Sequence, residues 1–579
     1  MFILSFKTGH DPAACLLEDG HIVAAAEEER FVRVKHAADY FPENAIKYCL
    51  SVRNFKLDDV DYIVFARAKN FPTLLKVAGY FMVRPPKNFT ELRYALSLLK
   101  VQLKGVLAAT LKRAPYQQIF RKIGGKRRRI YSFDHHLCHA SSAYYGSGFN
   151  EAAVLCMDGK GEATSVSMWY GENGELKALK RYGIFHSLGY LYGSVTDFLG
   201  FRINDGEYKV MGLAPYGKST YPMDDVFSVN EKGVRVNTRY SLYPFSLANL
   251  KKRFLGISKE YNEASPPQTN TDIAATLQDR LEKAALWYVR KLSSLLQTTH
   301  YSPRASFGGA GKLQTLNLCL AGGVALNVKM NKAIWESGLV DKLWIQPAAG
   351  DMGNVLGAAW LLYHKKFGIR PGELEHLYLG PEYGEQEIEK ALKSSGLNFR
   401  KSEDISQATA DLLAQGKIVA WFQGRMEFGP RALGSRSVLA DPRKQEMKEI
   451  INAKVKFREP FRPFCPSFLE GWGEKLFENY LPSPYMIRSF LVKPEWRSKI
   501  PAVCHVDGTV RPQEVFHGTH SRYAKMIEYF YKKTGVPVVL NTSLNVKGEP
   551  IVNTPEEAII FFKKTDVDYL AMRDYIVEK

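Results

Sequence analysis

The feature that most constrains the fold of this chain is a pattern of short apolar runs and glycine turns that occurs twice. In the first copy, Asp19-Gly20 separates the second and third runs, and the three runs are residues 2–6, 13–17 and 21–26. Asp-Gly between apolar runs is a strong signal for a β-hairpin. The second copy has a glycine loop at 158–162 and a turn at 171–174, and its runs are residues 152–157, 165–170 and 176 onward. The sequence therefore predicts two strand–glycine loop–strand–turn–strand units.

A duplicated unit whose copies each present a phosphate-facing loop is typical of the actin/hexokinase/Hsp70-like ATPase core, a duplicated ribonuclease H-like fold. An adenosine loop would complete the pattern, and the apolar run 316–320 leads into a glycine pair that opens a helix. Backbone N–H groups at such a helix start favour a ligand. A strand at 342–345, the loop 350–354 and a helix at 355–366 follow. We expect an α/β fold whose nucleotide contacts come from Gly159, Gly161, Gly322, Gly323, Asn327 and Asn354.

Two histidines and two acids have the spacing of metal ligands. His135 and His139 are four residues apart and would share one face of a helix, while Asp158 and Asp351 each follow a predicted strand. Two imidazoles with one or two carboxylates suit a divalent transition ion such as iron, zinc or manganese. For the histidine pair alone, an exposed helix without any ligand is the alternative.

Length and composition indicate a multidomain protein of ordinary globular type. A chain of 579 residues is too long for one core, and 45% hydrophobic and 24% charged residues are usual for soluble proteins. The seven cysteines form no CxxC pair, which favours a reducing compartment. With no basic leader and no apolar run of membrane-spanning length, we expect a cytoplasmic location. We place the domain boundary between residues 371 and 372, giving domains 1–371 and 372–579.

The net charge of +19 is concentrated in an insert at residues 84–129, where 13 lysines and arginines stand against one acid, Glu91. The segment also carries leucines three or four residues apart, namely Leu92, Leu96, Leu99, Leu103, Leu107 and Leu111. This spacing predicts an amphipathic helix. Its stripe would either pack on the parent domain or bind anionic lipid or another polyanion.

The densest group of functional residues lies in the second half, after a predicted helix at 405–415 and strand at 417–422. Residues 423–437 and 454–464 mix arginine with glycine, proline and phenylalanine. Arginines in such rigid loops suit one small dianion, because the guanidinium binds phosphate through two hydrogen bonds. The sequence thus favours a phosphate pocket over a solvated basic face.

Smaller signals lie near the predicted nucleotide site. Lys35 follows a strand that should end close to the site and is a candidate anion contact. Glu207 and Lys209 stand in a glycine-bounded segment and would contact substrate and nucleotide, with a solvated turn as the alternative.

Long motifs in this order resemble the NodU/CmcH family of O-carbamoyltransferases, which act on nodulation factors and antibiotics. The resemblance runs nearly end to end, through HDPAACLLEDG, DHHLCHA, MDGKGEATS, DGEYKVMGLAPYG, AGGVALN, GRMEFGPRALGSRS, KVKFREPFRPF and NTSLNVKGEPIV. It implies an N-terminal domain related to the catalytic subunit of tRNA threonylcarbamoyl transferase and a C-terminal YrdC-like domain.

The resemblance also implies a two-step reaction. Carbamoyl phosphate and ATP would form carbamoyl-adenylate with release of phosphate and pyrophosphate, and a hydroxyl of a small molecule or glycan would then attack it, releasing AMP. Both co-substrates would be held by Arg431, Arg436, Lys456, Arg511 and Ser543. His10 would be the general base, and the adenylate would lie near Lys35, Glu207 and Lys209.

The metal implied by the resemblance is iron(II), with magnesium accompanying ATP. The iron would be held by His135, His139, Asp158 and Asp351. The chain departs from the family pattern where Ser435 and Cys465 replace an expected Asn and Ala beside the pocket.

Two other functions compete. Threonylcarbamoylation of tRNA would use the shared domains and the +19 charge, and a basic membrane- or polyanion-binding protein would use residues 84–129. We expect a hydroxyl-bearing acceptor, no nucleic acid partner, a peripheral membrane contact through 84–129 and a homodimer as one option for assembly. The acceptor itself cannot be read from the sequence.

Overall fold

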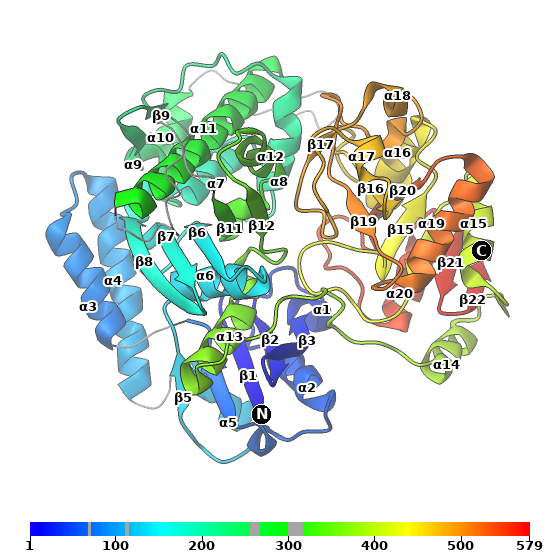
Figure 1. Ribbon diagram of the computed structural model, residues 1–579, viewed down its shortest axis with the longest axis horizontal. Helices are drawn as coiled ribbons and strands as arrows, with labels where there is room; N and C mark the ends of the chain where they lie inside the picture. The colour runs from blue at the N-terminus through cyan, green and yellow to red at the C-terminus, as the bar shows by residue number, and fades with distance from the viewer. Residues whose placement is uncertain (68–70, 111–114, 255–266, 299–315) are drawn as a thin grey trace, which may run out of the picture. The chain divides into compact units, whose positions relative to one another are not determined.

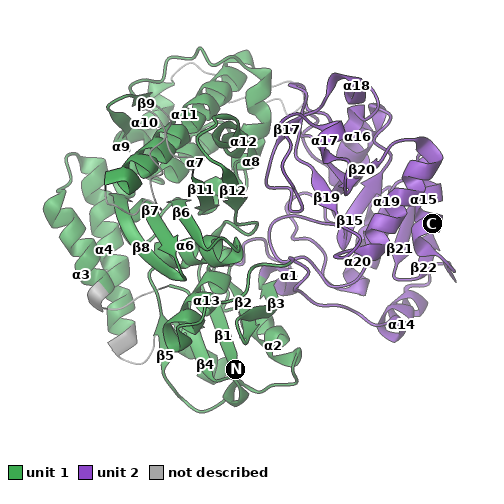
Figure 2. Cartoon of the chain, viewed as in Figure 1, with its two compact units in different colours: residues 1–28, 38–375 green, residues 29–37, 376–579 purple. Residues whose placement is uncertain are grey.

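The chain folds into two compact units (Figures 1 and 2). The computed structural model describes residues 1–67, 71–110, 115–254, 267–298 and 316–579. Unit 1 comprises Met1–Glu28 and Ala38–Glu375, and unit 2 comprises Glu29–Ala37 and His376–Lys579. The division after residue 375 lies close to the boundary that we expect from sequence, but the segment 29–37 belongs to unit 2.

Arginines fix the segment 29–37 within unit 2. Arg30, which is buried, donates a 2.7 Å hydrogen bond to the carbonyl oxygen of Gly429. Arg33 donates to the carbonyl oxygens of Pro550 and Ile551 at 2.8 and 2.6 Å. Helix α1 (Glu29–Val32) thus packs with residues some 400 to 500 positions away in the chain.

Unit 1 contains two five-stranded sheets of the same topology, ordered β3-β2-β1-β4-β5 and β12-β11-β6-β7-β8. In each, the first three strands along the chain are antiparallel neighbours and two later strands run parallel to the first. The first sheet consists of β1 (Phe2–Lys7), β2 (Ala13–Glu18), β3 (His21–Glu27), β4 (Tyr62–Phe65) and β5 (Ile130–Ser132). The second consists of β6 (Glu151–Met157), β7 (Thr164–Glu172), β8 (Glu175–Gly183), β11 (Asn317–Ala321) and β12 (Lys342–Ile345). The predicted duplicated fold is confirmed.

Both copies use the same tight turn in the second hairpin. Asp19 and Gly20 have φ of 45° and 89°, and Asn173 and Gly174 have φ of 51° and 88°. Two successive left-handed residues form the turn whose twist matches the flanking strands. The turn that we expect at 171–174 is shorter than predicted, because β7 continues to Glu172.

Helices α6 (His135–Gly146) and α13 (Asn354–Phe367) pack against each other inside unit 1. Asp134 caps α6 by accepting the Leu137 N–H at 3.1 Å. A methyl group added at Gly357 would lie only 2.0 Å from the carbonyl oxygen of Cys138. Glycine at this position therefore lets the backbones of α6 and α13 approach each other closely.

The remaining helices of unit 1 include α2 (Glu43–Ser51), α7 (Leu188–Phe198), α8 (Glu207–Leu213), α9 (Thr238–Ser241), α10 (Leu247–Arg253), α11 (Gln268–Thr298) and α12 (Val328–Glu336). A small sheet pairs β9 (Phe227–Asn230) with β10 (Gly233–Val236). Among the described residues, none of the helices is long and apolar enough to cross a membrane.

Residues 71–83 form α3 (Phe71–Val83), and the basic insert that follows forms α4 (Phe89–Thr110) and α5 (Gln118–Lys122). The predicted amphipathic helix is present as α4, but its buried face holds Tyr94 and Leu98, while Leu92 and Leu96 are exposed. Of the predicted stripe, Leu99 packs against the core of unit 1, whereas Leu92, Leu96, Leu103 and Leu107 are exposed, so the interpretation that the stripe packs on the parent domain is wrong for most of its members. The last predicted stripe residue, Leu111, lies outside the described residues.

Unit 2 is built on an eight-stranded mixed sheet with the order β13-β22-β21-β14-β15-β20-β16-β19. Its strands are β13 (Phe399–Lys401), β14 (Val419–Phe422), β15 (Arg436–Ala440), β16 (Cys465–Leu469), β19 (Gln513–Val515), β20 (Val538–Ser543), β21 (Tyr569–Met572) and β22 (Tyr575–Glu578). The core between this sheet and helices α15 (Ile405–Ala414), α19 (Ser521–Thr534) and α20 (Pro555–Lys564) includes Trp421 and Phe530. The predicted α/β character of the second half is confirmed.

We expect Gly357→Ala and Gly79→Ala to change stability in opposite directions. The first should destabilise unit 1 by about 1–3 kcal/mol, because an extra methyl group overpacks the contact between α6 and α13. Gly79 is also helical but has nothing within 4 Å of an added methyl group, so alanine there should stabilise by up to about 1 kcal/mol. Denaturant unfolding of the two full-length variants measures both effects. Equal free energies would refute the close-packing argument.

Candidate active site

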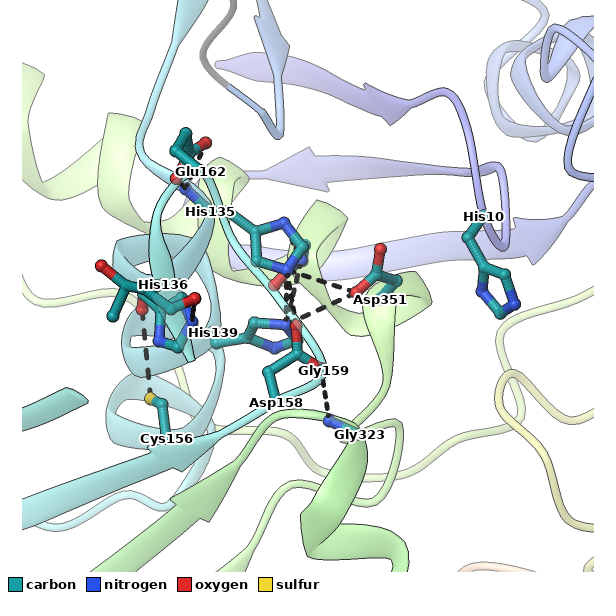
Figure 3. Close-up of polar contacts among 12 residues, drawn as sticks. His10, His135, His136, His139, Cys156, Asp158, Gly159, Glu162, Gly323 and Asp351 are labelled. Atoms are coloured by element: carbon teal, nitrogen blue, oxygen red, sulfur yellow. Dashed lines mark hydrogen bonds and ion pairs between the residues drawn. The ribbon is translucent and has the colours of Figure 1, made fainter. Parts of the chain in front are cut away.

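Four side chains predicted as metal ligands converge in unit 1 (Figure 3). His135 and His139 come from α6, Asp158 follows β6, and Asp351 precedes α13. One ligand atom of each lies within 4.8 Å of the others. The Nε2 atoms of the two histidines are 3.1 Å apart, and Asp158 Oδ2 and Asp351 Oδ1 lie 3.2 and 3.3 Å from His135 Nε2. The structure thus brings together residues separated by more than 200 positions in the chain.

These spacings fit donors around a single cation. Ligand atoms each about 2.1 Å from an ion and at right angles are about 3 Å apart. The two Nε2 atoms face each other at 3.1 Å, so their lone pairs would oppose each other unless a proton or a cation lies between them. Nitrogen and carboxylate oxygen together suit a divalent transition ion. The donor set is therefore compatible with the metal that the sequence predicts.

The charged groups of the cluster stabilise one another in their ionised forms. Burial by itself would lower the pKa of His135, but the carboxylates of Asp351 and Asp158 raise it to about 9. Burial opposes ionisation of Asp351, yet Lys7 and His135 hold the pKa of Asp351 well below its usual range. The two carboxylates are therefore ionised near neutral pH and favour a cation between them and the histidines.

Lys7, at the end of β1, is a neighbour of the cluster that sequence analysis missed. It is fully buried, and its Nζ lies 2.8 Å from Asp351 Oδ2. It also donates to the carbonyl oxygen of His10. The sequence contained a signal for this role, because Lys7 ends an otherwise apolar strand. A lysine buried at such a position needs a partner of opposite charge.

Two further buried groups position α6. Glu162 accepts the His135 N–H at 3.3 Å, at the end of the helix where the N–H groups and the helix dipole favour negative charge. His136 lies 2.8 Å from the Ser167 hydroxyl and 3.0 Å from the Thr164 carbonyl oxygen. Burial and the neighbouring His135 lower the pKa of His136 to about 3. His136 is thus a neutral group that ties α6 to the start of β7.

His10 lies in the turn after β1, beyond Asp351 in Figure 3. Its Nδ1 is 2.8 Å from Asp11 Oδ2. Burial would lower the pKa of His10, but the hydrogen bond and charge of Asp11, with a contribution from Asp351, raise it above 6.5. An imidazole oriented by a carboxylate is the arrangement of a general base.

The predicted nucleotide loops are only partly open to a ligand. Gly323 N–H donates to Asp158 Oδ1 at 3.1 Å, and Gly161 N–H donates to the Thr164 carbonyl oxygen at 2.7 Å. Gly322 has φ of 88°, and an added methyl group would lie 2.2 Å from the Met157 carbonyl oxygen. These glycines thus shape the loops around the cluster. Gly159 lies beside the Tyr190 ring.

The two predicted asparagine contacts have different surroundings. Asn327 caps α12 through the Met330 N–H at 2.9 Å and pairs with Gln278. Asn354 places its Nδ2 3.4 Å from His135 Nδ1 and from His139 Nε2, so it belongs with the histidines.

Glu207 and Lys209 lie on α8. Glu207 accepts the Asn204 N–H at 2.9 Å, and burial raises its pKa. Lys209 Nζ lies 5.5 Å from the centre of the Phe201 ring.

Unit 2 holds a second polar site around Lys456. This buried lysine donates to the carbonyl oxygen and hydroxyl of Ser543 at 2.7 and 3.2 Å, and to two oxygens of Asn545, each at 2.8 Å. Burial and three nearby cations, Arg458, Arg462 and Lys35, lower the pKa of Lys456. Lys35 is therefore a member of this cationic site within unit 2.

One buried acid partly balances this charge. Glu459 lies 3.3 Å from Arg462 and 3.3 Å from Lys547. The five basic residues Lys35, Lys456, Arg458, Arg462 and Lys547 gather around Glu459, so the site has the positive character of an anion-binding pocket.

The other predicted pocket residues differ in burial. Arg436 is fully buried, and its Nη groups donate to the carbonyl oxygens of Gln423, Gly424, Ser435 and Pro381. Arg511 donates to the sulfur of Cys465 at 3.2 and 3.0 Å, so the cysteine that departs from the expected pattern orients this arginine. Arg431 is half-buried in the loop before β15.

Comparison with known proteins places this architecture in one family. The description "Carbamoyltransferase N-terminus" matches residues 3–360, and "Carbamoyltransferase C-terminus" matches residues 410–579. The protein sll1178 of Synechocystis sp. is 38% identical over 98% of this chain and 95% of its own length. Nodulation protein NolNO of Sinorhizobium fredii is 35% identical over 98% of this chain and 79% of its own.

A third relative, nodulation protein NolO of Bradyrhizobium diazoefficiens, is 38% identical over 77% of this chain and 79% of its own length. The chain belongs to the carbamoyltransferase family, and the protein is a carbamoyltransferase enzyme. The resemblance noted in the sequence is confirmed.

We expect Lys7→Met to destabilise unit 1 far more than Lys47→Met. Both lysines have a carboxylate 2.8 Å away, but Lys7 is fully buried whereas the Lys47 side chain is 57% exposed beside Glu43. Removing one partner of a buried ion pair costs about 3–5 kcal/mol, and an exposed pair contributes about 0–1 kcal/mol. Denaturant unfolding at pH 7 checks the difference. If the two losses are equal, Lys7 does not compensate the buried charge of Asp351.

Proposed function

We propose that the protein is an ATP-dependent O-carbamoyltransferase that makes carbamoyl-adenylate from carbamoyl phosphate and ATP and transfers the carbamoyl group to an alcohol. The observation that carries the proposal is the excess of positive charge around the buried Lys456 in unit 2. Burying several positive charges close together is unfavourable in free energy unless an anion binds among them. Carbamoyl phosphate and the phosphates of ATP have the required charge.

The first half-reaction belongs to unit 2. Water cleaves carbamoyl phosphate to carbamate and phosphate, and a carbamate oxygen then attacks the α-phosphorus of ATP, so that pyrophosphate leaves and carbamoyl-adenylate remains. Lys456, Arg431 and Arg511 hold the phosphate groups, and Ser543 donates its hydroxyl. Arg436 supports their loop through its bonds to backbone carbonyls. Magnesium accompanies ATP in this step.

The second half-reaction belongs to unit 1. His10 accepts the proton of the acceptor hydroxyl as its oxygen attacks the carbamoyl carbon and AMP leaves, and Asp11 orients the imidazole. Glu207 and Lys209 of unit 1 are proposed contacts of the adenylate in this step, and Lys35, in the cationic site of unit 2, is a proposed contact of the adenylate where it forms. General-base catalysis of this kind contributes about 10²–10⁴-fold in rate.

A divalent cation would be held by His135, His139, Asp158 and Asp351. When bound, it would neutralise phosphate charge and polarise the acyl group. The family resemblance favours iron(II). Asn354 and Lys7 would position the histidines and Asp351 around it.

The acceptor is proposed to be a hydroxyl group of a small molecule or glycan. Two relatives bear the printed name nodulation protein, as NolNO and NolO, and neither printed name refers to tRNA. A dependence on bicarbonate and threonine in place of carbamoyl phosphate would instead support threonylcarbamoylation of tRNA.

We expect substitutions in the two units to separate the half-reactions. With ATP and carbamoyl phosphate, Lys456→Met and Arg431→Ala should each lower pyrophosphate formation about 100-fold or more, because each removes a positioned charge from the reacting phosphates. His139→Ala should leave pyrophosphate formation nearly unchanged and lower the release of AMP. The exposed Arg400→Ala is the matched control and should affect neither.

The readouts are a coupled pyrophosphate assay and chromatographic measurement of AMP. Unchanged pyrophosphate formation in both unit 2 variants, with the fold verified by circular dichroism, would exclude the phosphate pocket from the reaction.

We expect the transfer step to lose activity as pH falls through a pKa above 6.5, because His10 acts as a base only when neutral and its pKa is raised. Asp11→Asn removes the hydrogen bond and charge that raise this pKa, so the acid limb should move to lower pH. The measurement is kcat/KM against pH for AMP release, with the exposed Asp39→Asn as control. A limb that stays in place in Asp11→Asn would show that another group is the base.

A further inference from the structure

Helix α3 and the insert helix α4 pack against the rest of unit 1 through one face. From α3, Val77 and Phe81 are buried, and from α4, Tyr94, Ala95 and Leu98. These side chains form one core cluster with residues outside the insert, namely Ile184, Phe185 and Leu242. The packing of α3 and α4 on the rest of unit 1 therefore uses this face.

The opposite face of α4 is a leucine stripe left in solvent. Its members and their exposed fractions are Phe89 71%, Leu92 45%, Leu96 60%, Leu103 49% and Leu107 53%. At about 100° per residue, the five side chains fall within a sector of about 60°, and the middle of this sector lies roughly 170° from the mean direction of Tyr94 and Leu98. The stripe is thus a continuous surface along the helix and not the edge of the buried face.

Helix α3 adds to this apolar surface. Leu75 is 55% exposed and Met82 82% exposed, and at seven residues apart they share one side of their helix. In the described part of the chain, nine of the seventeen large exposed hydrophobic residues lie on α3 and α4. Such a concentration marks a surface that another apolar surface covers.

The charge around the stripe is positive. Arg93, Lys100 and Lys104 are exposed and lie within about 60° of Phe89 around α4. Glu91, the single acid of residues 84–129, is buried, where it accepts the Lys87 N–H at 2.7 Å and the Thr238 hydroxyl at 2.6 Å. Among the described residues, neither Lys100 nor Lys104 has a carboxylate within ion-pair distance. The surface beside the stripe therefore presents cations without acids of its own.

We propose that the α3–α4 hairpin is a membrane-docking surface that lays the leucine stripe into the interface of a bilayer containing anionic lipids. A helix with leucine and phenylalanine on one side and lysine and arginine beside them has the chemistry of interfacial helices. The 22 residues of α4 extend about 33 Å along the bilayer plane. This inference goes beyond the proposed reaction and does not depend on it.

Three partners could cover this surface: a second copy of the chain, a nucleic acid or an anionic bilayer. The charge of the surface distinguishes among them. A second copy of the chain would bring the same cations face to face with these, because a two-fold interface pairs a patch with itself. A nucleic acid would satisfy the cations but would leave the five large apolar side chains in water. An anionic bilayer would bind the cations through its headgroups and cover the apolar side chains with its acyl chains.

The test is flotation of the full-length protein with vesicles of phosphatidylcholine alone or with 30% phosphatidylglycerol. We expect binding to the anionic vesicles and at least tenfold weaker binding to the neutral ones. Leu96→Ser/Leu103→Ser should lower the partition coefficient by roughly tenfold per leucine. Lys100→Gln/Lys104→Gln should lower it by about 30-fold in total, and added salt should weaken binding of the native chain.

Matched controls come from exposed residues outside the insert. Ile369→Ser/Ile560→Ser replaces residues that are 56% and 50% exposed, and Lys393→Gln/Lys532→Gln replaces lysines that are 67% and 62% exposed. Both should bind vesicles as the native chain does, and pyrophosphate formation should be unchanged in every variant.

Three outcomes would overturn the proposal. The first is equal binding of the native chain and Leu96→Ser/Leu103→Ser to anionic vesicles. The second is a dimer in light scattering that dissociates in this leucine variant while no form binds vesicles, which would assign the stripe to a second copy. The third is RNA binding that is lost in the lysine variant and kept in the leucine variant, without vesicle binding, which would assign the surface to a polyanion.

Discussion

The close approach of helices α6 and α13 determines where the chemistry of unit 1 can occur. Because Gly357 has no side chain, the backbone of α13 lies directly against the Cys138 carbonyl of α6. This contact places both α6 histidines beside the loop that carries Asp351. Lys7 from the first sheet then balances Asp351, while Asp158 enters from the second sheet. One helix contact thus joins both halves of the duplicated fold in a single cluster.

The two units concentrate opposite charges. In unit 1, two ionised carboxylates face two histidines with one buried lysine nearby, an environment that favours a cation. In unit 2, lysines and arginines surround Lys456 with Glu459 as the nearby acid, an environment that favours an anion. The proposed reaction would use the anion-binding site of unit 2 in its first step and the cluster of unit 1 in its second.

Much of the fold could be predicted, because repeated local patterns determine it. Asp19-Gly20 and Asn173-Gly174 define the hairpins of both copies, and the order of the later strands follows from the duplication. The four-residue spacing of His135 and His139 likewise predicts that they share a helix face.

Features that depend on tertiary packing could not be predicted. Lys7 looks like the end of an apolar strand until Asp351 is brought to it from a distant part of the chain. The amide of Gly323 looks free until Asp158 accepts it. The leucine spacing of α4 predicts an amphipathic helix correctly, yet the buried face contains Tyr94 and Leu98, which pack with Ile184, Phe185 and Leu242. Periodicity identifies a helix and does not show which side its neighbours cover.

The segment 29–37 has a consequence for biosynthesis. It leaves the ribosome some 400 to 500 residues before its hydrogen-bond partners at Gly429, Pro550 and Ile551. Unit 2 therefore cannot close as an independent late domain, since Arg33 bonds across a sequence separation of 518 residues, and such long-range closure slows folding. A fragment that starts at residue 376 would lack this segment of unit 2. A nascent chain must keep the segment available until Pro550 and Ile551 have been synthesised.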